Sequence, residues 1–237
     1  MPVFRLRRDH VFPDPRLAHP SGVIAHGGDL HPDRVLLAYA NGIFPWYSDD
    51  SPLFWYSPDP RFVLPTDQLK LQRSLKKRIR RAEYRITLDT SFADVLRGCA
   101  TVHRPDQDGT WLTEDLQAAF RDLHRRGYAH SVEAWRGDEL VGGLYGIAIG
   151  QLFCGESMFA TASDASKVAF AHLVRQLERW GTPLVDCQIH TPHLERFGAF
   201  EVPRERFLAD LATLRERPQR PGPWTFDADL TPQVVAG

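Results

Sequence analysis

The sequence is poor in cysteine, and the few that it has are scattered. It contains three cysteines in 237 residues, Cys99, Cys154 and Cys187, and no two of them form a C-x-x-C pair. An odd number of scattered cysteines argues against a disulfide framework and against a structural zinc site. The cysteine content therefore indicates a reducing compartment, and we expect the protein in the cytoplasm.

Long apolar runs and a charge imbalance are also lacking. No window approaches the roughly 18 uninterrupted apolar residues of a membrane-spanning helix, and the first residues, MPVFRLRRDHVFPDP, lack the apolar core of a signal peptide. The net charge is −1, so the chain as a whole is not the strongly basic protein that binds nucleic acid through its overall charge. We expect no membrane association, and any contact with RNA has to come from a local cluster of charge.

What the sequence does contain is enough apolar residues for a large core. Hydrophobic residues make up 43% of the chain, and the length suits one large domain or two unequal ones. Residues 12–65 are dense in proline, glycine and aromatic residues, with one short helix expected in HPDRVLLAYANG, which Pro32 begins and Asn41-Gly42 ends. We predict a small loop-rich module at residues 1–62 and a larger domain at 63–237.

The larger domain alternates strands and helices. Strands are expected in EYRITLDT, AHSVEAW, ELVGGLYGIAI, QLFCGESMF and PLVDCQI, and helices in SFADVLRGCA, TEDLQAAFRDLHRRG and DASKVAFAHLVRQLERWG. The order of strand, two helices, three-strand meander, long helix, strand, short helix and strand resembles the fold of GCN5-related N-acetyltransferases. We therefore predict an α+β protein whose larger domain is acetyltransferase-like, with a mixed, mostly antiparallel sheet. The divergent tail after Arg217 is expected to be poorly ordered.

A basic amphipathic helix is predicted at the start of the larger domain. In TDQLKLQRSLKKRIRRA, Leu71, Leu75 and Ile79 are spaced four apart and form one apolar stripe. Residues 70–85 contain eight Lys or Arg and a single acid, Glu83. Such a face can bind phosphates without reading a base sequence, although a charge run is often only a solvated surface. The candidate phosphate contacts are Arg73, Lys76, Lys77 and Arg80.

Several motifs occur together and in order between about Phe12 and Phe207. They are FPxPxLAxPxGxxAxGGDL, GIFPWYS, WYSPDPR, GTWLTEDL, AHSVEAW, LVGGLYG, LFCGESMF, ASK and DCQ. In this combination the sequence resembles the leucyl/phenylalanyl-tRNA–protein transferase family. The resemblance implies an enzyme that transfers Leu, Phe or Met from aminoacyl-tRNA to a protein with an N-terminal Arg or Lys, and so creates a bacterial N-degron. It implies neither a metal nor a cofactor, and we expect a monomer.

The implied reaction is the aminolysis of an ester, which depends on positioning more than on a strong base. An α-amino group has a pKa of about 7.7 to 8.0, so a useful fraction is neutral at cytoplasmic pH. Holding the amine and the ester in attack geometry can supply roughly 7 to 11 kcal/mol, and general-base catalysis about 10²- to 10⁴-fold more in rate. We therefore expect a site that aligns two substrates.

An acid and an amide interrupt the apolar strand PLVDCQI. Asp186 and Gln188 lie two residues apart, so on a regular strand both point to the same face. There Gln188 can hydrogen-bond the incoming amine while Asp186 orients Gln188, and by resemblance the pair is the family's proposed proton-relay site. The alternative is that the acid and the amide satisfy each other or a nearby backbone group. The residues leave open whether Asp186 takes a proton or acts only electrostatically.

The resemblance assigns further residues to the substrates. It places Glu156 at the amine-bearing side of a substrate, where an acid suits a cationic acceptor; the alternative is a structural salt bridge. It places Trp46, Tyr39 and Trp111 near the terminal adenosine, in a cleft between the two modules. The candidates for the pocket of the donor side chain are Leu144, Phe153, Met158 and Trp111, and ordinary core packing is the alternative for each.

Two other functions compete with this interpretation. An acyl-CoA transferase of the same fold needs a glycine-rich backbone nest for the pyrophosphate before the long helix, and MFATASDASK lacks one. A non-catalytic tRNA-binding module would have no use for an acid and an amide beside an apolar pocket. The sequence therefore favours an aminoacyltransferase.

Overall fold

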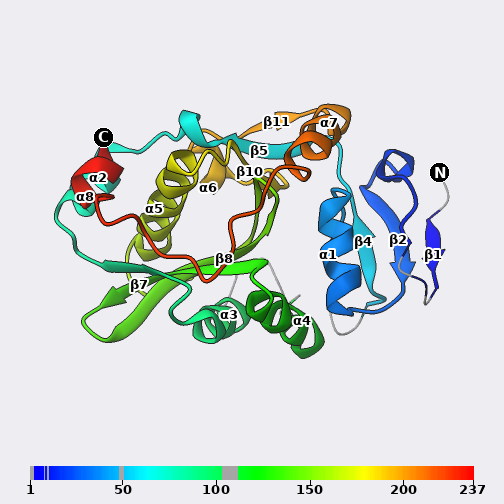
Figure 1. Ribbon diagram of the computed structural model, residues 1–237, viewed down its shortest axis with the longest axis horizontal. Coiled ribbons are helices and arrows are strands. Elements are labelled where there is room, and N and C mark those ends of the chain that lie inside the picture. The colour runs from blue at the N-terminus through cyan, green and yellow to red at the C-terminus, as the bar shows by residue number, and fades with distance from the viewer. Residues whose placement is uncertain (1–2, 8, 10, 48–50, 103–111) are drawn as a thin grey trace.

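The computed structural model describes residues 3–7, 9, 11–47, 51–102 and 112–237, and in these residues the strands form two sheets (Figure 1). The small sheet, near the N-terminus, has four strands in the order β1 (Phe4–Leu6), β2 (Val23–Gly27), β4 (Phe54–Tyr56) and β3 (Phe44–Pro45). A short 3-10 helix, Pro15–Leu17, lies between its first two strands, and helix α1 (Pro32–Ala40) connects β2 to β3. The helix predicted in this module is thus confirmed.

The second sheet has seven strands and carries most of the chain. Their spatial order is β11 (Phe200–Val202), β5 (Arg61–Pro65), β10 (Leu184–Gln188), β9 (Leu152–Ala160), β8 (Glu139–Ile149), β7 (Ala129–Arg136) and β6 (Arg85–Leu88). Strand β10 runs parallel to β9, and every other neighbouring pair is antiparallel. The prediction of an α+β fold with a mixed, mostly antiparallel sheet is confirmed.

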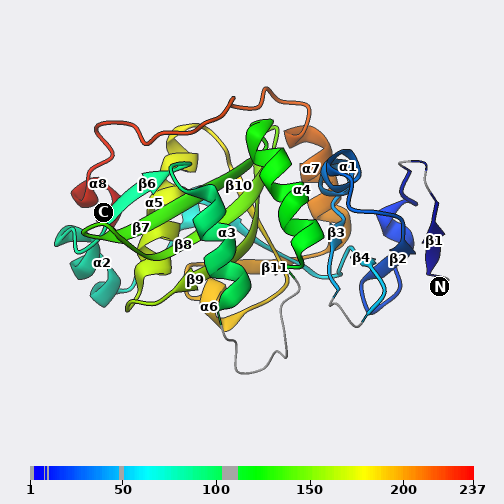
Figure 2. The same cartoon turned by 90° about the horizontal axis from the view of Figure 1, so that it is seen from below.

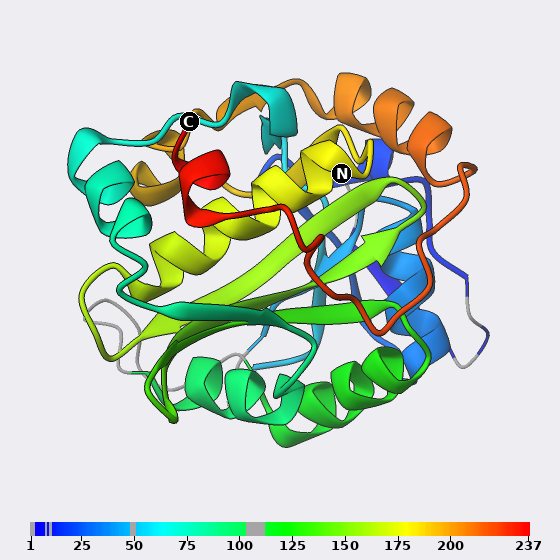
Figure 3. The ribbon, with the colours of Figure 1, turned by 60° about the vertical axis from the view of Figure 1, so that its left-hand side comes forward.

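Helices cover both faces of the large sheet (Figures 1 and 3). Helices α3 (Phe92–Thr101) and α4 (Glu114–Arg125) lie on one face, and α5 (Ala165–Arg179) lies on the other. Thr113 caps α4 by accepting a hydrogen bond from the backbone N–H of Leu116. The remaining helices are α2 (Arg73–Arg80), α6 (Pro192–Glu195), α7 (Arg204–Leu214) and α8 (Pro232–Ala236).

The two sheets share one apolar core. A single cluster of buried residues contains Ile24 and Trp55 from the small sheet together with Tyr145 and Phe207 from the larger part of the chain. Helix α7 packs beside the C-terminal end of α1 (Figure 2). Gly42 makes this approach possible, because a Cβ there would come within 2.8 Å of a Leu208 methyl group, and its φ is +73°. The small sheet is thus fixed against the large one.

The predicted basic helix is shorter in the structure than in the sequence pattern. Residues 66–68 form a 3-10 turn, and helix α2 begins only at Arg73, with Leu75 and Ile79 buried as expected. The segment before α2 is held away from helical geometry because the backbone N–H of Lys70 donates to the carbonyl of Phe197. A tertiary hydrogen bond therefore overrides the local helical pattern.

The expectation of a poorly ordered tail after Arg217 is wrong. Trp224 is only 4% exposed, and its ring stacks on His130 with centroids 3.5 Å apart. Its backbone N–H also donates to the buried carboxylate of Asp89. The tail crosses the molecule from α7 and ends in α8, where Val235 is buried against the large domain (Figure 3). Apolar anchors within a polar, proline-rich segment hold the tail in place.

The structure contains no candidate for a membrane span in the parts of the chain that it describes. No helix there is both long enough and apolar enough to cross a lipid bilayer.

We expect Trp224→Ala to lower the free energy of unfolding by roughly 3 kcal/mol, because truncation of a buried aromatic side chain typically costs about 3 to 5 kcal/mol. Val234→Ala is the matched control, since Val234 lies on the same tail but is 48% exposed. Urea denaturation followed by circular dichroism measures both values. Equal losses in the two variants would contradict the anchoring role of Trp224.

Candidate active site

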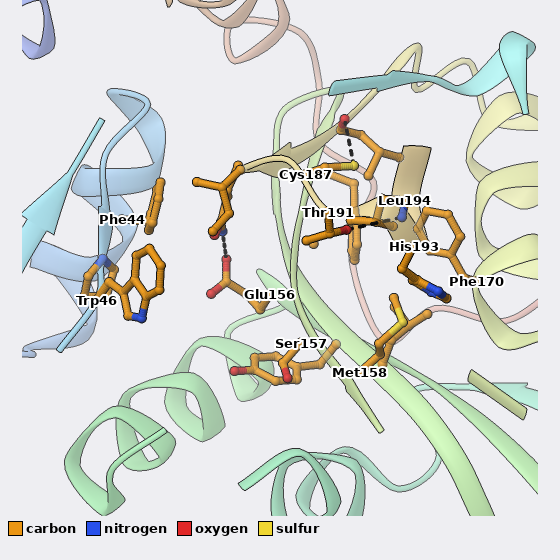
Figure 4. Close-up of a pocket in the computed structure, with 18 residues that line it drawn as sticks. Phe44, Trp46, Glu156, Ser157, Met158, Phe170, Cys187, Thr191, His193 and Leu194 are labelled. Carbon is orange, nitrogen blue, oxygen red and sulfur yellow. Dashed lines mark hydrogen bonds between the residues drawn. The ribbon is translucent and has the colours of Figure 1, made fainter. Parts of the chain in front are cut away.

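A cavity of about 430 Å³ lies where the small sheet faces the large one (Figure 4). Phe44 and Pro45 of β3, followed by Trp46, form one wall, and the ends of β9 and β10 form the other. Most of the remaining lining is apolar: Leu144, Phe153, Met158, Phe170, Val185, Ile189 and Leu194. The cavity therefore suits an apolar group that is held between two parts of the chain.

Two β-bulges bring polar side chains to the wall. In β9 the register against β8 shifts at Glu156, and in β10 the register against β5 shifts between Asp186 and Gln188. Bulges redirect side chains and are frequent next to active sites. Opposite the first bulge stands Gly146, where a Cβ would lie 2.2 Å from the carbonyl oxygen of Cys154, so only glycine fits.

Glu156 and Gln188 meet across these bulges. The amide Nε2 of Gln188 donates to Oε1 of Glu156 at 2.6 Å, the bond drawn as a dashed line beside Glu156 in Figure 4. Gln188 has a φ of +64°, a left-handed backbone conformation that non-glycine residues adopt rarely and mostly at functional sites. Because its amide nitrogen is engaged, Gln188 keeps the amide oxygen as an acceptor for a substrate.

The pKa of the Glu156 carboxyl group is raised, which favours its protonated form. Burial raises its pKa to about 8; hydrogen bonding from Tyr39 and Gln188 opposes that rise, and the negative charge of Asp186 adds to it. The Tyr39 hydroxyl is buried beside Glu156, and it is the strongest of the influences that oppose the rise. A cation entering the cavity will favour ionisation of Glu156.

Asp186 lies behind the wall and does not line the cavity. It is fully buried, and its two oxygens accept hydrogen bonds from Nε and Nη2 of Arg61 at 2.8 and 2.6 Å. Oδ1 also accepts from the backbone N–H of Gln188 at 2.9 Å. The prediction for this pair assumed that side chains alternate regularly along the strand, and the bulge interrupts that alternation. Asp186 therefore contacts the backbone N–H of Gln188 and not its side-chain amide.

The predicted substrate-binding residues divide into three groups. Trp46, Leu144, Phe153 and Met158 line the cavity, and Trp46 is 40% exposed beside Tyr56. Tyr39 lies beneath the wall, 1% exposed. Trp111 is outside the residues that the structure describes.

The four predicted phosphate contacts of helix α2 do not line the cavity. Lys76 and Arg80 each donate to the carbonyl of Gly237, at 3.4 and 2.9 Å, whereas Arg73 and Lys77 are exposed. The helix therefore offers a partly covered basic surface.

Other basic residues lie closer to the cavity. A small depression lined by Lys70, Lys167 and Arg196 adjoins it, and His193 belongs to the walls of both. Burial lowers the pKa of His193, and the positive charges of Lys167 and Arg196 lower it further. Figure 4 shows His193 with Met158 and Phe170 at the end of the cavity away from Trp46. That end of the cavity is lined by apolar side chains, and the adjoining depression contains Lys70, Lys167 and Arg196 together with Asp164.

The start of helix α5 is not arranged for a pyrophosphate. Asp164 occupies the N-cap position and pairs with Lys167 at 2.5 Å and with Arg78 at 3.4 Å. A carboxylate at this point repels a phosphate, which agrees with the missing glycine-rich nest.

Comparison with known families decides the kind of site. The family model described as leucyl/phenylalanyl-tRNA protein transferase matches residues 63–212, and the model of its N-terminal domain matches residues 28–59. The chain belongs to the leucyl/phenylalanyl-tRNA–protein transferase family. As a member of that family it is an aminoacyltransferase.

Relatives with the same name cover nearly the whole chain. The leucyl/phenylalanyl-tRNA–protein transferase of Anaeromyxobacter sp. (strain Fw109-5) is 53% identical over 98% of this chain and 99% of its own. That of Myxococcus xanthus (strain DK1622) is 52% identical over 98% of this chain and 100% of its own.

Likeness to solved structures is much weaker. A functionally unknown conserved protein from Staphylococcus epidermidis has a TM-score of 0.42 at 10% identity, and it matches over 76% of this chain and 68% of its own.

Several transferase residues escaped the sequence analysis. Arg61 ends the family motif WYSPDPR, but nothing in the sequence indicates that its partner is Asp186, 125 positions away. Phe44 lies in the family motif GIFPWYS but was given no role, Phe170 gave no signal beyond its apolar character, and His193 gave none. Only the tertiary structure brings these three side chains to the cavity and Arg61 to Asp186.

The pKa of Glu156 predicts how stability depends on pH. An unfolded Glu titrates near 4.3, so between about pH 4.3 and 8 the unfolded chain loses a proton that the folded chain keeps. Over that window the wild type should lose stability relative to Glu156→Gln, by roughly 1 kcal/mol per pH unit. Urea denaturation at pH 5 and pH 8.5 measures the difference. Glu216→Gln, at a side chain 75% exposed, is the control; a gap between Glu156→Gln and wild type that does not grow with pH would refute the assignment.

Proposed function

We propose that the cavity binds the aminoacylated 3′ end of a tRNA and joins its amino acid to the N-terminal Arg or Lys of an acceptor protein. One observation carries this proposal. A polar pair, Gln188 hydrogen-bonded to Glu156, stands in the wall of an apolar cavity whose opposite wall holds a half-exposed tryptophan, Trp46. The relatives are named as leucyl/phenylalanyl-tRNA–protein transferases, and this name suggests Leu and Phe as donor amino acids and a protein as acceptor.

The donor amino acid fits the apolar end of the cavity. Leu144, Phe153 and Met158 are proposed to contact its side chain, with Met158 as the adaptable element. Such a pocket separates side chains that differ by a methylene by only about 1 to 3 kcal/mol, so we extend the donors from Leu and Phe to Met. The apolar lining at this end disfavours charged side chains such as Lys and Arg as donors.

The terminal adenosine is proposed to stack on Trp46, at the opposite end. A base stacked on an aromatic side chain contributes about 1 to 3 kcal/mol. By resemblance Trp111 is a second aromatic partner and Tyr39 lies nearby. Because Tyr39 is buried, we propose that it acts by supporting Glu156.

The proposed reaction, aminolysis of the aminoacyl ester, forms one C–N bond and breaks one C–O bond. The neutral α-amine of the acceptor attacks the ester carbonyl, a C–N bond forms, and the C–O bond to the ribose breaks. The amine gives up a proton, and the departing ribose oxygen takes one. The free amide oxygen of Gln188 is proposed to accept a hydrogen bond from the attacking amine, so that the amine meets the ester in attack geometry.

Glu156 is proposed to recognise the positive charge of the acceptor. Its raised pKa favours the protonated form, and an approaching Arg or Lys side chain would lower that pKa and form a charge-assisted contact. A neutral acceptor side chain supplies no positive charge to stabilise the ionised form of a buried carboxyl group. The proposed preference for Arg and Lys thus follows from burial.

The remaining tRNA is proposed to lie along basic surface. Arg196 adjoins the cavity, and Arg73, Lys76, Lys77 and Arg80 of α2 extend the positive charge away from it. Phosphate contacts are independent of base sequence, as an enzyme that accepts several tRNAs requires.

We further propose that the protein is a monomer in the cytoplasm and that its products are N-degrons.

A transfer assay tests the proposed function. Purified protein with Leu-, Phe- or Met-tRNA should label peptides that begin with Arg or Lys and leave peptides that begin with Ala unlabelled. Gln188→Ala should lower kcat by about 10- to 100-fold, because the amine loses its positioning partner. Gln151→Ala, at the turn between β8 and β9, is the matched control. No transfer by the wild type, with tRNA binding intact, would favour a non-catalytic tRNA-binding module.

Charge reversal at exposed basic residues tests the path of the tRNA. Lys77→Glu should raise the KM for charged tRNA severalfold and leave kcat at saturation unchanged, because a phosphate contact is lost but the chemistry is not. The salt dependence of KM should also become shallower. The control is Arg206→Glu on α7, an exposed arginine whose side chain is 71% accessible. Equal effects of the two variants would remove α2 from the path.

A further inference from the structure

Arg61 is a buried cation that connects the two walls of the cavity. It begins β5, is 1% exposed, and its guanidinium group lies between the rings of Phe44 and Phe207, 5.0 and 4.4 Å from their centroids. Cations are stabilised over aromatic faces, most strongly when removed from water. Removing a cation from water costs free energy, and the contacts that offset this cost hold the guanidinium in one position.

On one side, Arg61 fixes the wall that carries Gln188. Its two hydrogen bonds to Asp186 form a bidentate pair, and the same carboxylate accepts the backbone N–H of Gln188 at 2.9 Å. Both carboxylate oxygens are thus occupied. The left-handed conformation of Gln188 is strained for a residue with a side chain, and this anchored carboxylate holds it.

On the other side, Arg61 fixes the wall that carries Trp46. Its Nη1 donates to the carbonyl of Gly42 at 3.0 Å, two residues before Phe44, whose ring covers the guanidinium. Phe44 lines the cavity and lies in β3, directly before Pro45 and Trp46. The guanidinium therefore touches both walls, one through Asp186 and the other through Gly42 and Phe44.

We propose that Arg61 is a positioning residue of the transfer reaction, which sets the distance between the amine site at Gln188 and the adenosine site at Trp46. This inference rests on the proposed function. Asp186 then serves as the anchor between Arg61 and the Gln188 backbone, since it has no surface in the cavity and both oxygens are engaged. Arginine is required because lysine offers no planar pair of donors for a carboxylate together with a further donor for a carbonyl.

Arg34 provides a matched control within the same chain. It is also fully buried, and it also bonds a carboxylate, Asp29 at 3.1 Å, and a backbone carbonyl, that of Arg7 at 2.8 Å. It lies in α1 and does not line the cavity. Loss of its contacts should destabilise the fold without moving the walls.

The first test compares Arg61→Lys with Arg34→Lys in the transfer assay. We expect both to lower the melting temperature, but only Arg61→Lys to lower kcat, by about 10- to 100-fold, because misplacement of reacting groups by about 1 Å has effects of that size. KM for each substrate should change less than kcat. A folded Arg61→Lys protein with the kcat of wild type overturns the inference, whereas a wild type without transfer activity overturns the proposed function.

The second test is chemical rescue. Arg61→Ala leaves a space between two aromatic rings, beside the carboxylate, that matches a guanidinium ion. Millimolar guanidinium chloride should restore part of the lost kcat of Arg61→Ala and leave the kcat of Arg34→Ala unchanged, and urea, of the same shape but neutral, should change neither. Rescue by urea, or equal rescue of both variants, contradicts positioning by this guanidinium. If Arg61→Ala does not fold, Arg61→Lys alone decides.

Discussion

The ion pair between Arg61 and Asp186 is the interaction on which the cavity depends. Burying two charges is expensive, and the structure offsets that cost with a bidentate contact, two aromatic faces and two backbone hydrogen bonds. Charges held in this way have little freedom to move. The pair therefore fixes the end of β10 against β3, although the two strands belong to different sheets.

Between these walls lies Glu156, for which we propose the recognition of a positive charge. Burial is the main cause of its raised pKa, and the negative charge of Asp186 adds to it, so protonation avoids a second buried anion close to Asp186. The carboxyl group can ionise when a cationic substrate supplies the missing partner. The chemistry of the site then consists mainly of alignment and charge complementarity, which suits an ester that is already activated and an amine that is partly neutral.

Local patterns were enough to predict helices α1, α3, α4 and α5 and the meander of the large sheet, whereas α7 and α8 were not predicted. The order of elements indicated the α+β fold. Strand β5 was missed because its five residues follow a proline-rich stretch and gain their place only by pairing with β10 and β11. The tail was misjudged because Trp224 needs His130 and Asp89, distant in sequence, to anchor it.

The sequence motifs named residues of the cavity wall, Glu156 and Gln188 among them, but not their geometry. Motifs pointed to Asp186, Gln188 and Glu156, yet alternation along a strand could not reveal the two bulges that separate Asp186 from the cavity and bring Gln188 to Glu156. A bulge depends on tertiary pairing, and its only local trace here is Gly146. The partner of Asp186 likewise comes from a strand far away in the sequence.

A crystal structure with a non-hydrolysable donor analogue, adenosine carrying leucine through a 3′-amide, tests the central claim most directly. The account predicts adenine on Trp46, the leucine side chain among Leu144, Phe153 and Met158, and the carbonyl carbon next to the amide of Gln188, with the Arg61–Asp186 pair unchanged and out of contact with the analogue. An analogue bound elsewhere, or an Asp186 that leaves Arg61 to contact the reacting groups, would contradict it.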